Sequence, residues 1–396
     1  MKTGRQQPTC QAAGPARIRN INRKAVLNEI RLHGPRSRSE LIRTLGLSAA
    51  AVSTIVGELL EDDLLRPVKP AIEPVTSRGR PQSPLELNPN AACALGLRLQ
   101  PVDQQLLIHM AWIDYANTPQ RITQPLICET DNLDHILRTV HKAFRQLEKR
   151  VADEKRIIGA VIAIPGLVSN TSIQFAPSLK VIEGDAFYRG LLQQTHYPIE
   201  MDNDVNLAVR FELYEKAEFR QQNFAYLYIG SGVGAGIGLG GEIWTSNGWA
   251  GEIGHLTLSR GDKGNQSFEA LLATHRQLSD QLERIGLPRD GVNELADIAQ
   301  REDAAKIIAE YAQLLHELVQ VLNSVLGLDE VVIDFPSGKL LQLLLDRVDQ
   351  LIDQQPLKLR VSAAESRHVA VVQGAALAAL EKYLDRVEQR IKLSAI

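Results

Sequence analysis

Short apolar runs alternate with longer amphipathic stretches from residue 91 to the end of the chain. The apolar runs predict buried strands, and they are Ala94–Leu99, Leu106–Trp112, Ile157–Ile164, Ile199–Met201, Ala225–Ile229 and Glu330–Ile333. Periodic apolar positions predict helices over Leu133–Val151, Val205–Tyr214, Ser267–Ile285 and Ala304–Gly327, with a last helix from about Ala370 to Val387. This alternation predicts an α/β fold for residues 91–396. We expect two lobes, one formed by about 91–204 plus the C-terminal helix and the other by about 205–370.

Residues 1–90 show a different pattern, which predicts three short helices followed by two short strands. The predicted helices cover Asn20–His33, a stretch that begins after Ser37 or Ser39 and ends at Leu45, and Ala49 to about Leu60. Ile21, Val26, Leu27 and Ile30 form the apolar stripe of the first helix. Gly46 supplies the tight turn of a helix-turn-helix. Leu64–Leu65 and Leu85–Leu87 predict the strands of a wing.

The third predicted helix has two unlike faces. Its apolar face consists of Val52, Ile55, Val56, Leu59 and Leu60. Its other face carries small or hydroxylated side chains near the helix N-terminus, which can lie close in a DNA major groove; they are Ser48, Ala49, Ala50, Ser53 and Thr54. Between the wing strands, the strip Arg78-Gly79-Arg80 can place two guanidinium groups in a narrow minor groove. These features predict a DNA-binding winged helix-turn-helix, against the alternative of a helical bundle with a basic linker.

Charge is distributed unevenly along a chain whose net charge is only −3. Residues 1–80 carry 14 Lys and Arg against 7 Asp and Glu, a balance of +7, so the remaining residues carry −10. A basic head on an acidic body indicates that the head meets a polyanion. The three cysteines, Cys10, Cys93 and Cys128, are too scattered for a disulfide framework. We expect a cytoplasmic protein without a membrane partner, because no stretch suits a signal peptide or a membrane span.

Two strand ends in the first half of the body carry candidate ligand contacts. Gly166 is the glycine of a Pro-Gly pair that ends a strand. The backbone can approach a ligand closely there, or the pair can form an ordinary turn. Asn203 and Asp204 lie at a strand end just before a helix. Their side chains can bind vicinal hydroxyls, and a carboxylate there can act as a general base. The alternative is a simple helix cap by Asp202 or Asp204.

Two glycine-rich segments follow in the second half of the body. The stretch Gly230–Gly236 can cradle a phosphate through its amides or can form a hairpin between apolar strands. The stretch Asn247–His255 places a carboxylate, Glu252, three residues before an imidazole, His255, among glycines. This pairing is unusual for a packed core and favours a functional site. Glu269 follows at the start of a predicted helix.

These segments, in this order behind a winged helix, resemble the ROK family of repressors, open reading frames and kinases. The resemblance runs from about Asn20 to the final helix and is to the repressor branch, which includes the N-acetylglucosamine and xylose repressors. It implies an actin-like, two-lobed sugar-kinase fold with sugar bound in the cleft. Asn203 and Asp204 match the family's sugar-binding Asn-Asp pair, and Glu252 and His255 match its Glu-x-Gly-His segment. Glu269 matches the Glu that closes the motif after it.

The chain departs from that family pattern in its nucleotide and zinc motifs. Family kinases have an Asp-x-Gly-Gly-Thr phosphate loop where this chain reads Gly96-Leu97-Arg98-Leu99-Gln100-Pro101. Leu and Gln cannot replace glycines that admit a phosphate, nor an Asp that partners magnesium. The Gly-Gly segment near the family's adenine site is replaced by Ile333–Ser337. We therefore expect no ATP. We also expect no zinc, because the interval from His255 to Glu269 contains none of the family's three cysteines.

The sequence predicts a non-enzymatic repressor whose operator binding responds to a sugar or sugar phosphate. Two alternatives remain: an ATP-dependent sugar kinase with a DNA-binding head, and a ligand-blind architectural DNA-binding protein. Paired half-sites multiply the specificity of a small winged helix, which predicts a homodimer or a dimer of dimers. The apolar face of Ala304–Gly327 suits a core first and a subunit interface second. Release from DNA is the commoner family response to sugar, and we expect it here.

Overall fold

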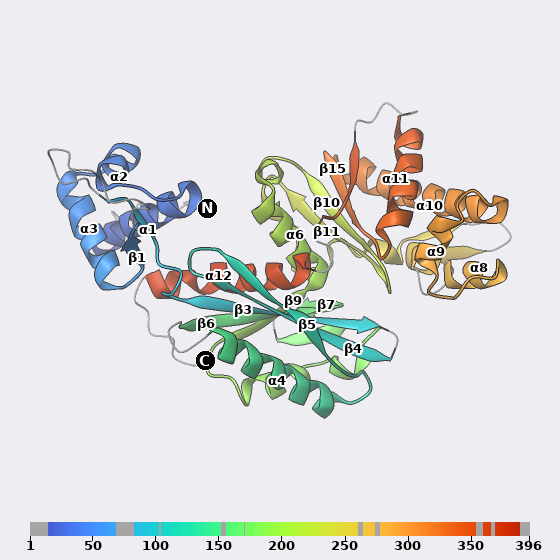
Figure 1. Cartoon of the computed structure of the whole chain (residues 1–396), viewed down its shortest axis with the longest axis horizontal. Helices are drawn as coiled ribbons and strands as arrows, with labels where there is room; N and C mark the ends of the chain where they lie inside the picture. The colour runs from blue at the N-terminus through green and yellow to red at the C-terminus, as the bar shows by residue number, and fades with distance from the viewer. Residues whose placement is uncertain are drawn as a thin grey trace, which may run out of the picture.

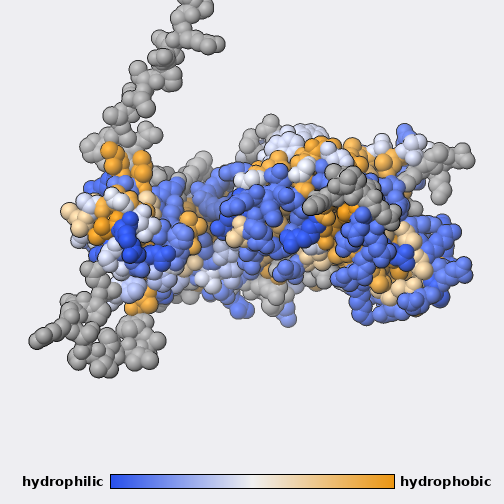
Figure 2. Space-filling view, turned by 90° about the horizontal axis from the view of Figure 1, so that it is seen from above, coloured by the Kyte–Doolittle hydropathy of each residue, from blue (hydrophilic) through white to orange (hydrophobic). Residues whose placement is uncertain are grey.

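The computed structural model describes residues 15–68, 83–102, 104–151, 156–169, 171–259, 264–273, 278–353, 359–365 and 369–388. Figure 1 shows a small N-terminal head at one end of a body that is built on two five-stranded sheets. We use "head" for the described part of residues 1–90 and "body" for that of residues 91–396. None of the described helices is long and apolar enough to cross a membrane. The face shown in Figure 2 is mostly hydrophilic, with apolar side chains in separate patches.

The head consists of α1 (Pro15–His33), α2 (Arg38–Leu45), α3 (Ala49–Glu61) and the antiparallel strands β1 (Leu65–Pro67) and β2 (Leu85–Leu87). Ser37 and Glu40 form a reciprocal capping box that begins α2, and Gly46 ends this helix in the left-handed conformation, with φ of 64°. Ser48 caps α3 by accepting a hydrogen bond from the backbone N–H of Ala51. The predicted helices and the helix-turn-helix turn are confirmed. Ile21 is a correction, because its side chain is 56% exposed and does not belong to the core.

The first sheet of the body has the order β5-β4-β3-β6-β9. Its strands are β3 (Cys93–Val102), β4 (Gln105–Asp114), β5 (Pro119–Glu129), β6 (Ile157–Ile164) and β9 (Ile199–Asn203). Helix α4 (Leu133–Val151) packs on one face and α12 (Ala370–Glu388) on the other (Figure 1). A hairpin of β7 (Leu167–Ser169) and β8 (Ser172–Phe175), with helix α5 (Ala186–Leu192), completes this lobe. Strand β5 escaped the sequence analysis because it is an edge strand with two prolines.

The second sheet has the order β12-β11-β10-β15-β16 and begins only after helix α6 (Asp204–Glu215). Its strands are β10 (Phe224–Ile229), β11 (Val233–Leu239), β12 (Glu242–Ile243), β15 (Glu330–Asp334) and β16 (Arg360–Ala363). Helix α6 packs on one face, while α10 (Glu302–Leu326) and α11 (Gly338–Ile352) share a core with the other. Smaller elements surround the lobe: β13 (Thr257–Ser259), β14 (Asn265–Ser267), α7 (Phe268–Leu272), α8 (Ser279–Arg284) and α9 (Val292–Asp297).

Three expectations about the second lobe are now decided. The single helix predicted over Ser267–Ile285 is wrong, because α7 ends at Leu272 and Ala273 is extended, with ψ of 120°. The Gly230–Gly236 segment forms the turn of the β10–β11 hairpin and the first residues of β11, as in the hairpin alternative. The apolar face of α10 is buried within the body, so it serves as core.

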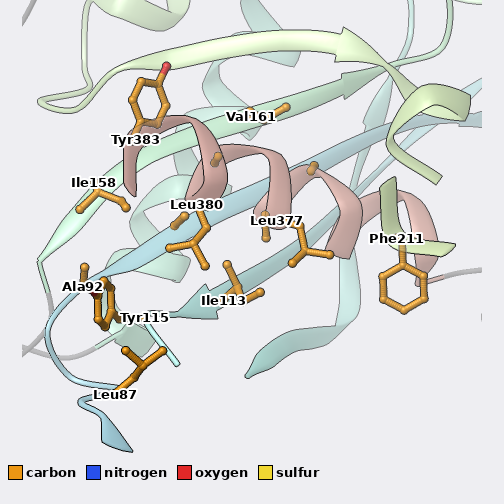
Figure 3. Close-up of a cluster of buried hydrophobic side chains, with 14 of the residues drawn as sticks. Leu87, Ala92, Ile113, Tyr115, Ile158, Val161, Phe211, Leu377, Leu380 and Tyr383 are labelled. Atoms are coloured by element: carbon orange, nitrogen blue, oxygen red, sulfur yellow. The ribbon is translucent and has the colours of Figure 1, made fainter. Parts of the chain in front are cut away.

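Helix α12 is the central packing element of the first lobe. Figure 3 shows its apolar side chains lying across the sheet, with Leu87, Ala92 and Tyr115 gathered near its C-terminal end. The head core and this part of the body form one continuous cluster of buried side chains. Gly96 of β3 makes the close approach of α12 achievable, because a Cβ at this position would overlap the Val372 carbonyl oxygen and the Ala376 nitrogen.

We expect Gly96→Ala to destabilise the protein by about 1–3 kcal/mol, the cost of forcing an extra methyl group into a packed core. The measurement is the free energy of unfolding from urea titration. Gly57→Ala on α3 is the matched control, since nothing lies within 4 Å of its added Cβ. This control should gain about 0.5–1 kcal/mol from higher helix propensity. Equal stability of Gly96→Ala and wild type would show that α12 can yield at this contact.

Candidate functional site

All six residues that the sequence indicated as ligand contacts line one cavity of about 100 Å³ between the two lobes. These residues are Gly166, Asn203, Asp204, Glu252, His255 and Glu269. The first three come from strand ends of the first lobe and the start of α6, and the last three from the segments after the β10–β11 hairpin. The fold therefore brings together side chains that lie up to about a hundred positions apart in sequence.

Asn203 fixes the geometry of the first-lobe side of the cavity. Its Oδ1 accepts hydrogen bonds from the backbone N–H groups of Val205 (2.9 Å) and Asn206 (3.1 Å), so it is the N-cap of α6. Its Nδ2 donates to the carbonyl oxygen of Gly166 at 3.0 Å. The helix cap considered in the sequence analysis is thus real, but Asn203 provides it rather than Asp202 or Asp204.

Asp204 is the most deeply buried acid of the cavity, with 8% of its surface exposed. Burial raises the pKa of its carboxyl from 3.8 to about 6. The buried guanidinium of Arg98 opposes this shift, as do backbone hydrogen bonds at the helix start, while Asp334 adds to it. The Asp204 carboxyl is ionised at neutral pH, and keeping it ionised in this buried position costs free energy.

Glu252 and His255 form a pair on the second-lobe side of the cavity. The His255 Nε2 and Glu252 Oε2 atoms are 3.4 Å apart. Burial raises the pKa of the Glu252 carboxyl, His255 lowers it, and the nearby carboxylate of Glu269 raises it further. The ring of Phe175 lies 6.0 Å from the His255 ring, centroid to centroid. Glu252 thus supplies an orienting partner for the His255 ring.

Two residues near the cavity were not found by sequence reasoning. Phe175 lines the cavity with 43% of its surface exposed, which is unusual for a phenyl ring. Tyr228 of β10 also lines this cavity. Neither carried a local signal, because an aromatic residue in a strand is most often core.

In the head, the predicted DNA-reading face of α3 is exposed along its whole length. Ser48, Ala49, Ala50, Ser53 and Thr54 are exposed, while Val52, Ile55, Val56 and Leu59 on the opposite face are buried. The Thr54 hydroxyl donates to the Ala50 carbonyl oxygen at 3.0 Å. The predicted wing strip, Arg78-Gly79-Arg80, lies outside the described residues.

The cavity residues do not fit the zinc site that the family motif with a histidine and three cysteines implies. Cys93 and Cys128 are buried in the core of the first lobe, away from His255. Within the described residues, no group of three or more His, Cys, Asp or Glu side chains could hold a metal ion. The arrangement therefore offers hydroxyl-binding groups without soft thiolate ligands.

A family model described as "ROK family" matches residues 119–382, well over half of the chain. The chain belongs to the ROK family. A second model, described as winged helix-turn-helix DNA-binding, matches residues 19–66. The predicted fold class, a winged helix-turn-helix followed by a two-lobed sugar-kinase-like ROK domain, is confirmed.

Relatives of this ROK chain include named repressors. It is 24% identical to the xylose repressor of Bacillus spizizenii over 67% of this chain and 69% of that protein. It is also 24% identical to the DNA-binding transcriptional repressor Mlc of Escherichia coli, over 89% of each chain. The chain is therefore a DNA-binding regulator of the ROK repressor type.

Solved structures share the fold. The structure of a ROK family transcriptional regulator, a homologue of E. coli Mlc, superposes with a TM-score of 0.73 at 22% identity, covering 94% of this chain and 99% of that one. A ROK glucokinase from Streptomyces griseus, solved with glucose and AMPPNP, gives 0.60 at 18% identity over 73% of this chain and 100% of that one. The kinase match covers less of the chain than the regulator match does.

We expect Asp204→Asn to stabilise the protein at pH 7.5 by about 3 kcal/mol, from a pKa raised by about two units. Because the folded-state pKa lies above the unfolded value, wild-type stability falls as pH rises from about 4 to above 6. The gain of the variant should therefore vanish near pH 4. Urea titration at pH 4, 5, 6 and 7.5 measures this profile. A gain that does not change with pH would contradict the assigned burial cost.

Proposed function

We propose that the chain is a transcriptional repressor whose operator binding is controlled by a sugar, or sugar phosphate, held in the interlobe cavity. The observation that carries this proposal is the single cavity lined by Asn203, Asp204, Glu252, His255 and Glu269. Carbohydrate recognition requires several fixed polar groups that match ring hydroxyls. Both lobes contribute such groups, so a bound sugar would bridge them and bias their closure.

Each polar group would have a distinct role toward a sugar. Asp204, Glu252 and Glu269 would accept hydrogen bonds from hydroxyls, and His255 could donate or accept. Asn203 already donates one N–H to Gly166 and caps α6, so it would act chiefly by positioning Asp204. A buried acceptor left without its hydroxyl costs about 1–3 kcal/mol, which is the source of specificity between sugars.

We also propose that the chain performs no ATP chemistry. Strand β3 pairs with β4 up to Val102, opposite Gln105, so the hairpin is tight where a kinase needs an open phosphate loop. Arg98 lies in this stretch with only 3% of its surface exposed, and its charge acts on Asp204. A buried cation that acts on Asp204 favours the carboxylate form, and its positive charge lies in the stretch that matches the family's phosphate loop.

The head would bind DNA through α3 and the wing as one half of a symmetric pair. The exposed N-terminal face of α3 is small enough to enter a major groove closely. A homodimer, or a dimer of dimers, would present two such heads to an operator with paired half-sites. Sugar binding would release the operator, which is the direction we propose.

The test is fluorescence anisotropy on DNA from upstream of the protein's own gene, with D-xylose as the first sugar because named relatives are xylose repressors. D-glucose, N-acetylglucosamine and their 6-phosphates complete the panel, with ATP as a control. We expect one sugar to weaken operator binding at least tenfold while ATP alone has no effect. Tight DNA binding that no sugar moves would contradict sugar control. Sugar-dependent release of ADP would favour the kinase alternative.

Glu252→Gln should keep operator affinity within twofold of wild type while weakening the sugar at least tenfold, because the amide cannot replace a carboxylate that accepts from hydroxyls. Isothermal titration calorimetry measures the sugar affinity, and anisotropy measures the operator affinity. Glu310→Gln, at an exposed position on α10, is the matched control and should change neither. Retention of full sugar affinity in Glu252→Gln would place the ligand elsewhere.

Replacing both Arg78 and Arg80 with Ala should weaken operator binding and reduce the salt slope of log affinity by up to ~2 units. Each arginine that neutralises a DNA phosphate releases about one counterion, so the slope counts the lost contacts. Anisotropy between 50 and 250 mM salt gives the slope. An unchanged slope would exclude the wing from DNA contact.

A further inference from the structure

Helix α12 is held in direct contact with the helix that begins at the candidate sugar site. Gly374 of α12 lies so close to α6 that a Cβ there would overlap the carbonyl oxygen of Leu207. Helix α6 begins at Asp204, which lines the cavity, and is capped by Asn203. Two helices in backbone contact cannot slide independently, so a displacement of α6 on ligand binding must move the first turns of α12.

The other end of α12 is fastened to the head by a buried carboxylate. Glu388 is 2% exposed, and its Oε1 accepts hydrogen bonds from Arg31 Nη2 at 2.8 Å and from the Tyr115 hydroxyl at 3.1 Å. The Nε of Arg23 donates to the Glu388 backbone carbonyl oxygen at 2.8 Å. The Arg31 guanidinium also lies over the Tyr115 ring, 5.4 Å from its centroid.

One of these arginines, Arg23, also contacts the DNA-reading helix α3. Arg23 of α1 is buried and forms ion pairs with Asp62, the C-cap of α3, and with Glu58 of α3, the latter at 3.6 Å. The contacts therefore run without a gap from the cavity through α6, α12 and α1 to α3. Charge-assisted hydrogen bonds are directional, so a shift or rotation of Glu388 would reorient α1 and with it α3.

The contact between Glu388 and Arg31 does not use all of the hydrogen-bonding atoms of the two side chains. Among the described residues, neither Glu388 Oε2 nor Arg31 Nε has a hydrogen-bond partner, although both atoms are buried. A buried charged atom without a hydrogen-bond partner costs free energy, so an arrangement that pairs these two atoms differently would relieve that cost. Incomplete pairing at this contact favours a role in a change of conformation over a role as a permanent link.

Resting on the proposed function, we propose that Glu388 is the residue through which sugar binding in the cavity controls the DNA-binding head. Helix α12 carries the displacement, and the Glu388 contact with Arg31, Arg23 and Tyr115 converts it into a change of head orientation. Loss of the carboxylate charge would leave both binding sites intact but uncouple them, because neither site contains Glu388.

The test compares Glu388→Gln with the matched control Glu381→Gln. Glu381 lies on the same helix and pairs with Arg210 of α6, and its carboxylate is exposed rather than buried. Operator affinity is measured by anisotropy with and without D-xylose or whichever sugar of the panel acts on wild type, and sugar affinity by calorimetry. We expect Glu388→Gln to bind sugar within twofold of wild type. We expect the sugar-induced change in its operator affinity to fall from at least tenfold to under twofold, with Glu381→Gln unchanged.

Tyr115→Phe keeps the proposal testable where Glu388→Gln does not fold. It removes one donor to Glu388 but retains the buried ring, and it should reduce the sugar-induced change at least threefold. Hydrogen exchange without sugar gives an independent readout. Amides of α1 should exchange at least tenfold faster in Glu388→Gln than in wild type or Glu381→Gln.

The outcomes separate the two proposals. If wild-type operator affinity responds to sugar and the Glu388 and Tyr115 variants respond equally, the coupling role is overturned while sugar control stands. If wild type responds to no sugar, sugar control fails, and the coupling proposal fails with it. Unchanged exchange of the α1 amides would overturn the role of Glu388 in holding the head.

Discussion

The packing of α12 against both β3 and α6 is the constraint on which the rest of the structure depends. Gly96 and Gly374 let backbone meet backbone on two sides of this helix, so its position is set by direct contact. The head core joins the same cluster of buried side chains. Head, first lobe and the start of the cavity therefore form one mechanical unit, while the second lobe is attached chiefly through α6 and the cavity wall.

Buried charge is placed at both ends of this unit, where it opposes stability. Burial raises the pKa of Asp204 to about 6, so ionisation at neutral pH costs free energy at the cavity. Glu388 and Arg31 leave buried atoms unpaired at the head, in the part of the chain that the structure describes. Replacing such a buried charged group together with its partner by apolar residues of similar volume is often neutral or stabilising. Sites that give up stability in this way are typical of binding and switching elements.

Sequence reasoning succeeded where local chemistry decides the structure and failed where distant contacts decide it. The start of α2 near Ser37 and the turn at Gly46 are set by local chemistry, and both were predicted, although the capping box itself was not. Strand β5 and the break at Ala273 depend on neighbours in the sheet and the second lobe, and periodicity alone missed them. Most cavity residues were found because their motifs place polar groups at a strand end, as with Asn203 and Asp204, or among glycines, as with Glu252 and His255. Phe175 and Glu388 carry no such signal, because their surroundings come from segments remote in sequence.

The geometry also indicates how a sugar-kinase fold serves regulation under the proposed function. A kinase uses sugar-binding energy to position a hydroxyl for phosphoryl transfer, whereas a regulator must use it to separate two conformations. Shifting a population from 1:99 to 99:1 requires a preference of about 5.5 kcal/mol for one state. Hydroxyl contacts of about 1–3 kcal/mol each supply this only if several of them form in one lobe arrangement and not in the other. A cavity whose acceptors are divided between the lobes meets that requirement, because opening the lobes breaks the contacts of one half at once.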